Sequence, residues 1–122
     1  MAVILVADDE EMVRIFASTV LRKAGHDVLA ARNGFEAVKL YRSSRRPIDL
    51  VITDITMPVM DGPQAVRLIR AAHPGARIIC MSGNGGTECP PGAFFLPKPF
   101  TPDALCASVT ELLMPSKAVG LA

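Results

Sequence analysis

Residues 3–12, VILVADDEEM, already indicate the fold class of this chain. They open with five consecutive apolar residues, which is typical of a strand that is covered on both faces. Asp8 and Asp9 follow directly, and two carboxylates about 4 Å apart repel each other by roughly 4 kcal/mol at an effective dielectric constant near 20. We therefore predict a buried strand that ends in an acidic site, where a positive charge offsets this repulsion.

Apolar runs of strand length alternate with amphipathic helical segments along the whole chain. Strands are expected at residues 3–7, 27–31, 49–54, 77–82 and 93–97, and helices at 10–24, 33–44, 62–72 and 101–113. Thr101 is predicted to cap the last helix, with Pro102 at its first position. Because strand–helix–strand units make right-handed crossovers, this alternation predicts an α/β fold with a parallel sheet and helices on both faces.

One crossover is irregular. The segment between Ser82 and Phe94, GNGGTECPPGA, contains four glycines and two prolines among eleven residues. Relative to alanine, glycine costs about 1 kcal/mol and proline about 3 kcal/mol inside a helix. We therefore predict that residues 83–92 replace a regular fourth helix with a loop or a single turn.

Length and composition limit the class of protein. The 122 residues suit one domain, which we place at 1–114, followed by a short tail at 115–122. Apolar runs reach about six residues, far short of the roughly 20 that a transmembrane helix needs, and no secretory signal is recognisable. The net charge of +1 disfavours nucleic acid as the main partner. We expect a cytoplasmic protein without membrane insertion or direct DNA binding.

The cysteines indicate reduced thiols. Cys80, Cys89 and Cys106 are odd in number, lie far apart in the chain and form no CxxC motif. This spacing predicts neither a metal site nor a disulfide framework.

Polar residues follow four of the predicted strands. Asp8 and Asp9 end the first strand, Asp54 ends the third, Ser82 ends the fourth and Lys98 follows the fifth. Ligands of open parallel sheets bind beyond the carboxyl ends of the strands, so these side chains are expected to meet at one edge. Clustered carboxylates suit Mg²⁺, whose charge keeps them ionised. The sequence therefore predicts a magnesium site in which Lys98 supplies a second positive charge.

Four motifs in a fixed order resemble the receiver domain of two-component response regulators. They are ADDEE, VITDITMPVMDG, CMSG and LPKPF, and the resemblance covers residues 3 to about 113. It implies a doubly wound, flavodoxin-like sheet of five parallel strands in the order 2-1-3-4-5.

The resemblance also implies the roles of the acidic residues. Asp54 is expected to accept a phosphoryl group, and Asp9 and Asp54 to bind Mg²⁺ through their side chains. Asp8 is expected to hold metal-bound water, and Thr56 to contribute its backbone carbonyl.

Further residues match the family's switch positions. Lys98 is expected to pair with the acceptor carboxylate and then with the phosphoryl group, towards which Ser82 moves. Phe95 matches the aromatic switch residue, although FF at 94–95 also fits plain alternation in and out of the core. Pro99 is expected after a cis peptide bond. Asn84 and Thr56 occupy positions that in this family tune how fast water reaches the phosphoryl group. Both residues are small and neutral, so we predict an intermediate lifetime for the phosphoryl group.

The function expected from these residues is that of a signalling module controlled by phosphorylation. Such a chain is a phosphoacceptor that assists its own phosphorylation and dephosphorylation, not an enzyme. Its expected partners are a histidine kinase or phosphotransfer protein and a downstream protein target, with the chain itself a monomer. It is either a stand-alone regulator or a receiver cut from a hybrid kinase.

Three alternatives stay open at this level. A hydrolase that forms an aspartyl phosphate usually carries Asp-x-Asp after the first strand, where this chain has adjacent aspartates. A flavin or nucleotide binder needs a phosphate loop at that place, where carboxylates repel phosphate. A degenerate receiver would bind partners without being phosphorylated.

Overall fold

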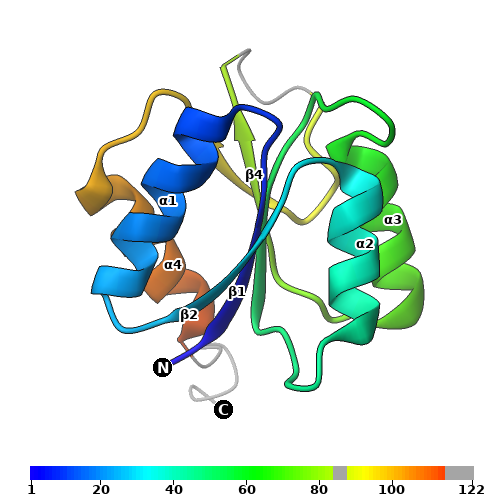
Figure 1. The fold of residues 1–122 in the computed structure, drawn as a ribbon, viewed down its shortest axis with the longest axis horizontal. Helices are drawn as coiled ribbons and strands as arrows, with labels where there is room; N and C mark the ends of the chain where they lie inside the picture. Colours follow the sequence, from blue (N-terminus) through cyan, green and yellow to red (C-terminus); the bar gives the residue numbers. More distant parts are fainter. Residues whose placement is uncertain (84–87, 115–122) are drawn as a thin grey trace.

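The computed structural model describes residues 1–83 and 88–114, which form a single parallel sheet flanked by helices (Figure 1). The strands are β1 (Val3–Ala7), β2 (Asp27–Ala31), β3 (Leu50–Asp54), β4 (Ile78–Ser82) and β5 (Phe94–Pro97). Their order is β2-β1-β3-β4-β5, and every neighbouring pair is parallel. The predicted order 2-1-3-4-5 is therefore confirmed.

Four helices lie in the described part of the chain. They are α1 (Glu11–Lys23), α2 (Gly34–Ser43), α3 (Gly62–Ala72) and α4 (Pro102–Leu113). Figure 1 shows α1 and α4 on one face of the sheet and α2 and α3 on the other. The fold is thus doubly wound, as the alternation of strands and helices predicts.

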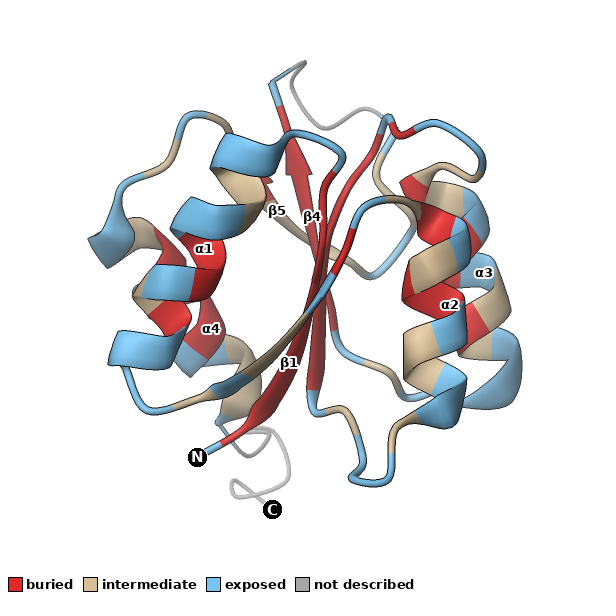
Figure 2. Ribbon diagram, in the orientation of Figure 1, coloured by how far each residue is buried: buried red, intermediate tan, exposed pale blue. Residues whose placement is uncertain are grey.

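Alternate residues of each central strand supply the two hydrophobic cores. Ile4 and Val6 pack with Leu21 and Leu105 under α1 and α4, whereas Leu5 packs under α2 and α3. Every residue of β1, β3 and β4 is buried, whereas β2 and β5 at the sheet edges are partly exposed (Figure 2). This burial on both faces explains why the central strands read as unbroken apolar runs.

The helix starts follow the expected capping chemistry, with one exception. The Thr101 hydroxyl accepts a hydrogen bond from the Ala104 N–H at 3.0 Å, which confirms the predicted cap of α4. Asp61 and Gln64 form a capping box at α3. Glu10 occupies the cap position of α1 but makes no side-chain capping bond. Its carboxylate is therefore available for another contact, described below.

The irregular crossover lies between β4 and β5. Gly83 and residues 88–93 contain no helix, in agreement with the prediction for this segment. The remaining residues of the predicted loop, 84–87, and the predicted tail, 115–122, lie outside the described residues. Within the described ranges, no helix has both the length and the apolar character needed to cross a membrane.

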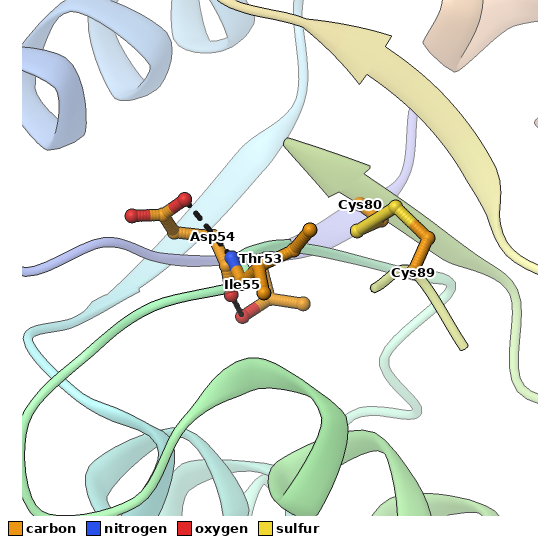
Figure 3. Close-up of a disulfide and its surroundings, with 5 residues drawn as sticks. All are labelled: Thr53, Asp54, Ile55, Cys80 and Cys89. Carbon is orange, nitrogen blue, oxygen red and sulfur yellow. Dashed lines mark hydrogen bonds between the residues drawn. A yellow bond between two sulfur atoms is a disulfide. The ribbon is translucent and has the colours of Figure 1, made fainter. Parts of the chain in front are cut away.

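The expectation of reduced thiols is wrong for two cysteines. Cys80 of β4 and Cys89 of the following crossover form a disulfide, with their Cα atoms 5.9 Å apart (Figure 3). The two cysteines are nine residues apart, a spacing that matches no sequence motif, and only the tertiary structure brings them together. Cys106 in α4 is the free cysteine of the described residues.

Candidate functional site

The carboxyl ends of β1 and β3 place two aspartates side by side. Ala7 of β1 lies opposite Thr53 of β3, so the residues that follow them, Asp8 and Asp54, reach the same edge of the sheet. Asp8 is fully buried, and Asp54 is 9% exposed. Two carboxylates thus occupy a site from which most water is excluded.

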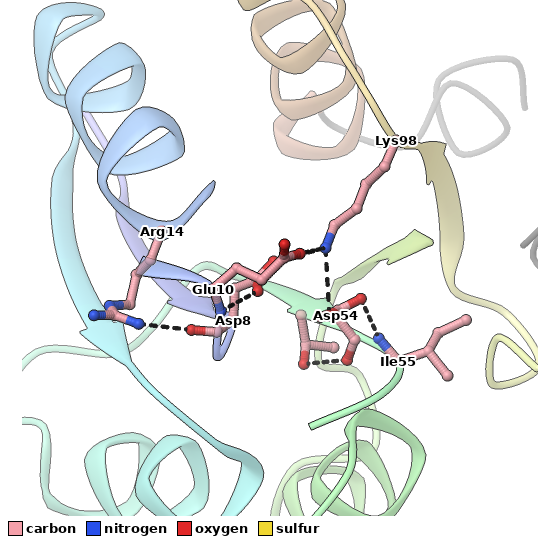
Figure 4. Close-up of polar contacts among 7 residues, drawn as sticks. Asp8, Glu10, Arg14, Asp54, Ile55 and Lys98 are labelled. Atoms are coloured by element: carbon pink, nitrogen blue, oxygen red, sulfur yellow. Dashed lines mark hydrogen bonds and ion pairs between the residues drawn. The ribbon is translucent and has the colours of Figure 1, made fainter. Parts of the chain in front are cut away.

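The end of β5 brings a cation to these acids. The Lys98 ammonium lies 2.9 Å from an oxygen of Asp8, 3.2 Å from one of Glu10 and 3.3 Å from one of Asp54 (Figure 4). The Lys98 backbone N–H donates to the Ser82 carbonyl at 2.9 Å, which anchors the end of β5 to the end of β4. Three carboxylates against one ammonium leave an excess of negative charge within this group.

The pKa values reflect this imbalance. Burial raises the pKa of both Asp8 and Asp54, and the charge of Asp8 raises that of Asp54 further, while Lys98 opposes the effect. Burial lowers the pKa of Lys98, but its contacts with Asp8, Asp54 and Glu10 outweigh this, so the pKa is raised overall. The site therefore holds ionised carboxylates at a cost that one ammonium does not remove.

The backbone after Asp54 is held closely against the start of α3. The Ile55 N–H donates to Asp54 Oδ1 at 2.9 Å, and the Gly62 N–H donates to the Ile55 carbonyl at 2.8 Å. A Cβ atom at Gly62 would lie 2.1 Å from the Asp54 carbonyl oxygen, closer than any real contact. The Asp-Gly pair of the motif MPVMDG therefore fixes the backbone on which the Asp54 carboxylate is mounted.

The acid group fits a divalent cation. Ligand oxygens of Asp8, Glu10 and Asp54 all lie within 4.8 Å of one another. Asp8 Oδ2 is buried and lies 2.9 Å from the Lys98 ammonium, which Glu10 and Asp54 also contact. Three carboxylates that share one ammonium suit a hard cation such as Mg²⁺.

The membership of this acid group differs in one residue from the set expected from the sequence. Asp9 is exposed and does not belong to the group within 4.8 Å, whereas Glu10 does. Glu10 lies just before α1, and its carboxylate contacts Lys98, which is 88 residues away in the chain. Glu10 was not predicted as a site residue from the sequence, because such a long-range contact leaves no local pattern. A glutamate at a cap position without a capping partner in reach is a weak signal that sequence reasoning could have used.

The other predicted site residues lie around this edge. Ser82 is 5% exposed at the end of β4, and Thr56 is exposed two residues after Asp54. Phe95 is half-buried on β5, opposite Cys80. The peptide bond between Lys98 and Pro99 is cis, as predicted. Asn84 lies outside the described residues.

A doubly wound parallel sheet with paired aspartates and a lysine at its carboxyl edge is the arrangement of a signalling receiver. Residues 4–110 match the family model of the response regulator receiver domain, and the chain belongs to this family.

Relatives and solved structures agree with this assignment. The chain is 35% identical over 118 residues to the sensor kinase CckA of Brucella abortus, covering 92% of this chain but 12% of that protein. It is 33% identical to the chemotaxis protein CheY of Thermotoga maritima, covering 89% of this chain and 95% of the relative. The crystal structure of the receiver domain from the hybrid histidine kinase CckA superposes with a TM-score of 0.82 at 35% identity, covering 92% and 99% of the two chains.

A complex provides a further structural match. CheY in the CheX–CheY–BeF3–Mg complex of Borrelia burgdorferi has a TM-score of 0.86 at 27% identity, with 93% of this chain and 90% of that chain covered. The chain is therefore a receiver domain of two-component signalling, a class that is controlled by phosphorylation, generally accepts phosphoryl groups and binds Mg²⁺ at an acidic pocket. The hydrolase and the degenerate receiver are not favoured by these relationships.

Neutralising Asp54 is expected to stabilise the metal-free protein at neutral pH. Because burial and Asp8 raise the pKa of Asp54 in the folded state above its usual value of 3.8, the folded state binds more protons than the unfolded state between pH 3.8 and the folded-state pKa. Stability is therefore lost as the pH rises from 3.8 through the folded-state pKa. In EDTA at pH 7, we expect Asp54→Asn to raise the free energy of unfolding by on the order of 1 kcal/mol.

Urea unfolding at several pH values measures this effect, with the exposed Asp103→Asn in α4 as the control. The gain of the Asp54 variant should disappear at pH values below 3.8. Mg²⁺ at 100 times its dissociation constant should stabilise the wild type by about 2.7 kcal/mol. A variant less stable than the wild type in EDTA at pH 7 would contradict the electrostatic account of the site.

Proposed function

We propose that this chain accepts a phosphoryl group on Asp54 from a histidine kinase or phosphotransfer protein, with Mg²⁺, and then changes its binding to a downstream protein. The observation that carries the proposal is the position of the Asp54 carboxylate. One of its oxygens is held by the Ile55 N–H at 2.9 Å, and the other lies 3.3 Å from the Lys98 ammonium, beside the buried Asp8.

The residues of this chain orient the acceptor and balance its charge. The Ile55 N–H holds one oxygen of the Asp54 carboxylate and so fixes its rotation. The other oxygen is then oriented towards an incoming phosphoryl group. The Lys98 ammonium can follow the charge from the carboxylate to the phosphoryl oxygens. Such positioning and charge stabilisation are the main contributions that proteins make to phosphoryl transfer.

Mg²⁺, when bound, supplies charge neutralisation at the phosphoryl oxygens. Asp54 would hold it from the end of β3 through its side chain, and Asp8 from the end of β1, mainly through metal-bound water. Asp9 and the Thr56 carbonyl complete the proposed set, on the basis of the family motifs that contain them. Glu10 is an additional acid at the rim of the site, where its exposure limits the strength of its ion pair with Lys98.

The output follows from the new charge. A phosphoryl group on Asp54 adds roughly −2 charge and three acceptor oxygens. Ser82 is proposed to move to these oxygens and Phe95 to occupy the space released, a proposal supported by their places on the adjacent strands β4 and β5. Phosphorylation then shifts the population between two states of the chain. We also propose that Thr56 and Asn84 tune the access of water.

The surface beside Lys98 suits the phosphoryl donor. A cavity of about 520 Å³ is lined mainly by apolar side chains of α1 and the β5–α4 connection, together with Glu10 and Lys98. Met12 is 82% exposed, and Phe16, whose ring is tilted against that of Phe100 with the ring centroids 5.9 Å apart, is 38% exposed. An apolar surface that shares Lys98 with the acidic site would place the donor's phosphohistidine close to Asp54.

Shortening an apolar side chain of this surface should separate protein donors from small donors. We expect Met12→Ser to slow transfer from a phosphorylated histidine kinase by about tenfold, the equivalent of 1.4 kcal/mol of lost contact. Phosphorylation by acetyl phosphate should stay within about twofold of the wild type, since Met12 is not part of the group formed by Asp8, Glu10 and Asp54. Radiolabel transfer measures both rates, with Phe35→Ser on α2, 58% exposed on the opposite face, as the control. Equal slowing by both variants would contradict this docking surface.

We further propose a cytoplasmic monomer that does not bind DNA directly, and the net charge of +1 supports the last point. The test of the proposed function is incubation of the full chain with acetyl phosphate, followed by intact mass. We expect a gain of one phosphoryl group that requires Mg²⁺, is prevented by EDTA and is released by hydroxylamine, as an acyl phosphate is. Absence of labelling, or a label stable to hydroxylamine, would overturn the proposal.

A further inference from the structure

The disulfide between Cys80 and Cys89 has no role in the function described so far. Cys80 lies in the middle of β4 and is 1% exposed, whereas Cys89 lies in the crossover and is half-buried. Cys106, the free cysteine of the described residues, lies on α4. The disulfide therefore joins a strand of the sheet to a connecting segment, and its Cys89 end lines a cavity.

This bond closes a ring that contains a residue of the proposed switch. Cys80 pairs in the sheet with Thr53, the residue before Asp54, and Ser82 follows two positions after Cys80 on the same face of β4. Figure 3 shows the disulfide beside the end of β3 that carries Asp54. The sulfur bridge therefore restrains the strand end from which Ser82 is proposed to move.

The crossover also forms one wall of a cavity against α3. Residues 88–91 face Pro63, Val66 and the two arginines Arg67 and Arg70 across a space of about 380 Å³. Cys89 lies in this wall, so the disulfide holds the wall to β4. Opening the disulfide removes the covalent tie between residues 88–91 and β4, the strand that ends in Ser82.

We propose that Cys80 and Cys89 are a redox-active pair whose oxidation state is coupled to phosphorylation, an inference that rests on the proposed function of Asp54. The oxidised pair restrains Ser82 in its unphosphorylated position, and the reduced pair releases it. Reduction therefore favours the phosphorylated state. In the cytoplasm, where we place this chain, disulfides are characteristic of redox sensing and catalysis and are rare as structural bonds.

The reaction is a thiol–disulfide exchange with a cellular dithiol. A thiolate of the dithiol attacks the sulfur of Cys89, the less buried of the two residues, and Cys80 leaves as a thiolate that takes up a proton. The second thiol of the reductant then attacks the mixed disulfide and releases Cys89 as a thiol. Two electrons and two protons pass to the cysteine pair, and the reductant departs as its own disulfide.

Coupling between two sites is reciprocal, so it can be measured from either side. If reduction favours phosphorylation by some factor, phosphorylation favours reduction by the same factor. Beryllofluoride with Mg²⁺ serves as the probe, because it mimics the phosphoryl group without turnover. We expect beryllofluoride to favour the reduced protein. Half of the full-length protein should then be reduced in a glutathione buffer that is at least about fivefold less reducing than the buffer needed without it.

Alkylation of free thiols followed by intact mass reports the reduced fraction in glutathione buffers of known composition. The wild type should show the shift with beryllofluoride and Mg²⁺, and Asp54→Asn should not. In a second arm, the proteins are incubated with acetyl phosphate. The phosphorylated fraction should be larger for the reduced wild type and for Cys89→Ser than for the oxidised wild type. Cys106→Ser should behave as the wild type does in each redox state.

The outcomes separate the two proposals. A protein that is phosphorylated on Asp54 to the same extent in both redox states, with an unchanged glutathione midpoint, retains the proposed function and overturns the redox coupling. A chain in which Cys80 and Cys89 stay reduced at every glutathione ratio overturns it as well. A protein that takes up no phosphoryl group in either redox state overturns the proposed function first, and the coupling with it.

Discussion

Asp54→Asn is expected to reduce phosphorylation by acetyl phosphate by at least about 1,000-fold, the scale on which an essential nucleophile acts. An amide lacks the negative charge that attacks phosphorus, and it weakens the contact that Lys98 makes at 3.3 Å. The substitution keeps the shape of the side chain, and its amide oxygen can still accept the Ile55 N–H. The expected loss is therefore chemical and leaves the position of the side chain intact.

Intact mass against time measures this loss in Mg²⁺ buffer, and Asp103→Asn is the matched control because it removes an exposed carboxylate on α4. The control should be phosphorylated at the wild-type rate. Circular dichroism checks that the Asp54 variant is folded, in line with the higher stability expected for it without metal. Full labelling of the Asp54 variant would show that another residue is the acceptor.

Lys98→Met is expected to slow the same reaction by about 100- to 1,000-fold, as does the loss of one preorganised electrostatic donor in other acyl- and phosphoryl-transfer sites. Lys98 is the cation that contacts Asp8, Glu10 and Asp54 in this structure. Without it, the charge that develops on the phosphoryl oxygens has no ammonium to balance it. The rate of Lys98→Arg should fall between those of the wild type and Lys98→Met, since guanidinium keeps the charge but has a different shape.

The initial rate of phosphorylation by acetyl phosphate at saturating Mg²⁺ measures the effect, with the exposed Lys39→Met on α2 as the control. Removal of Lys98 also leaves the buried Asp8 without its counter-charge, so the metal-free variant should be less stable than the wild type. Rates are therefore compared only where circular dichroism shows folded protein. A Lys98→Met rate within about twofold of the wild type would exclude a role in transfer.

Much of the fold and part of the site were predictable from local patterns. Unbroken apolar runs indicated β1, β3 and β4, because strands buried on both faces carry apolar residues at every position. The gathering of Asp8, Asp54 and Lys98 followed from a general rule, namely that the ends of parallel strands share one edge. The helix cap at Thr101 was also predictable, because it depends only on residues three positions apart in the chain.

Strand ends, periodicity and motif order are properties of short stretches of chain, and the sequence by itself therefore determined the sheet, its acidic edge and the family. Tertiary structure decided which oxygens meet: Glu10 is in the acid group and Asp9 is exposed, because the start of α1 sets the direction of each side chain. It also decided that Cys80 and Cys89 bond, because it places their Cα atoms 5.9 Å apart. Contacts of this kind depend on the direction of side chains and the path of loops, which residue spacing does not encode.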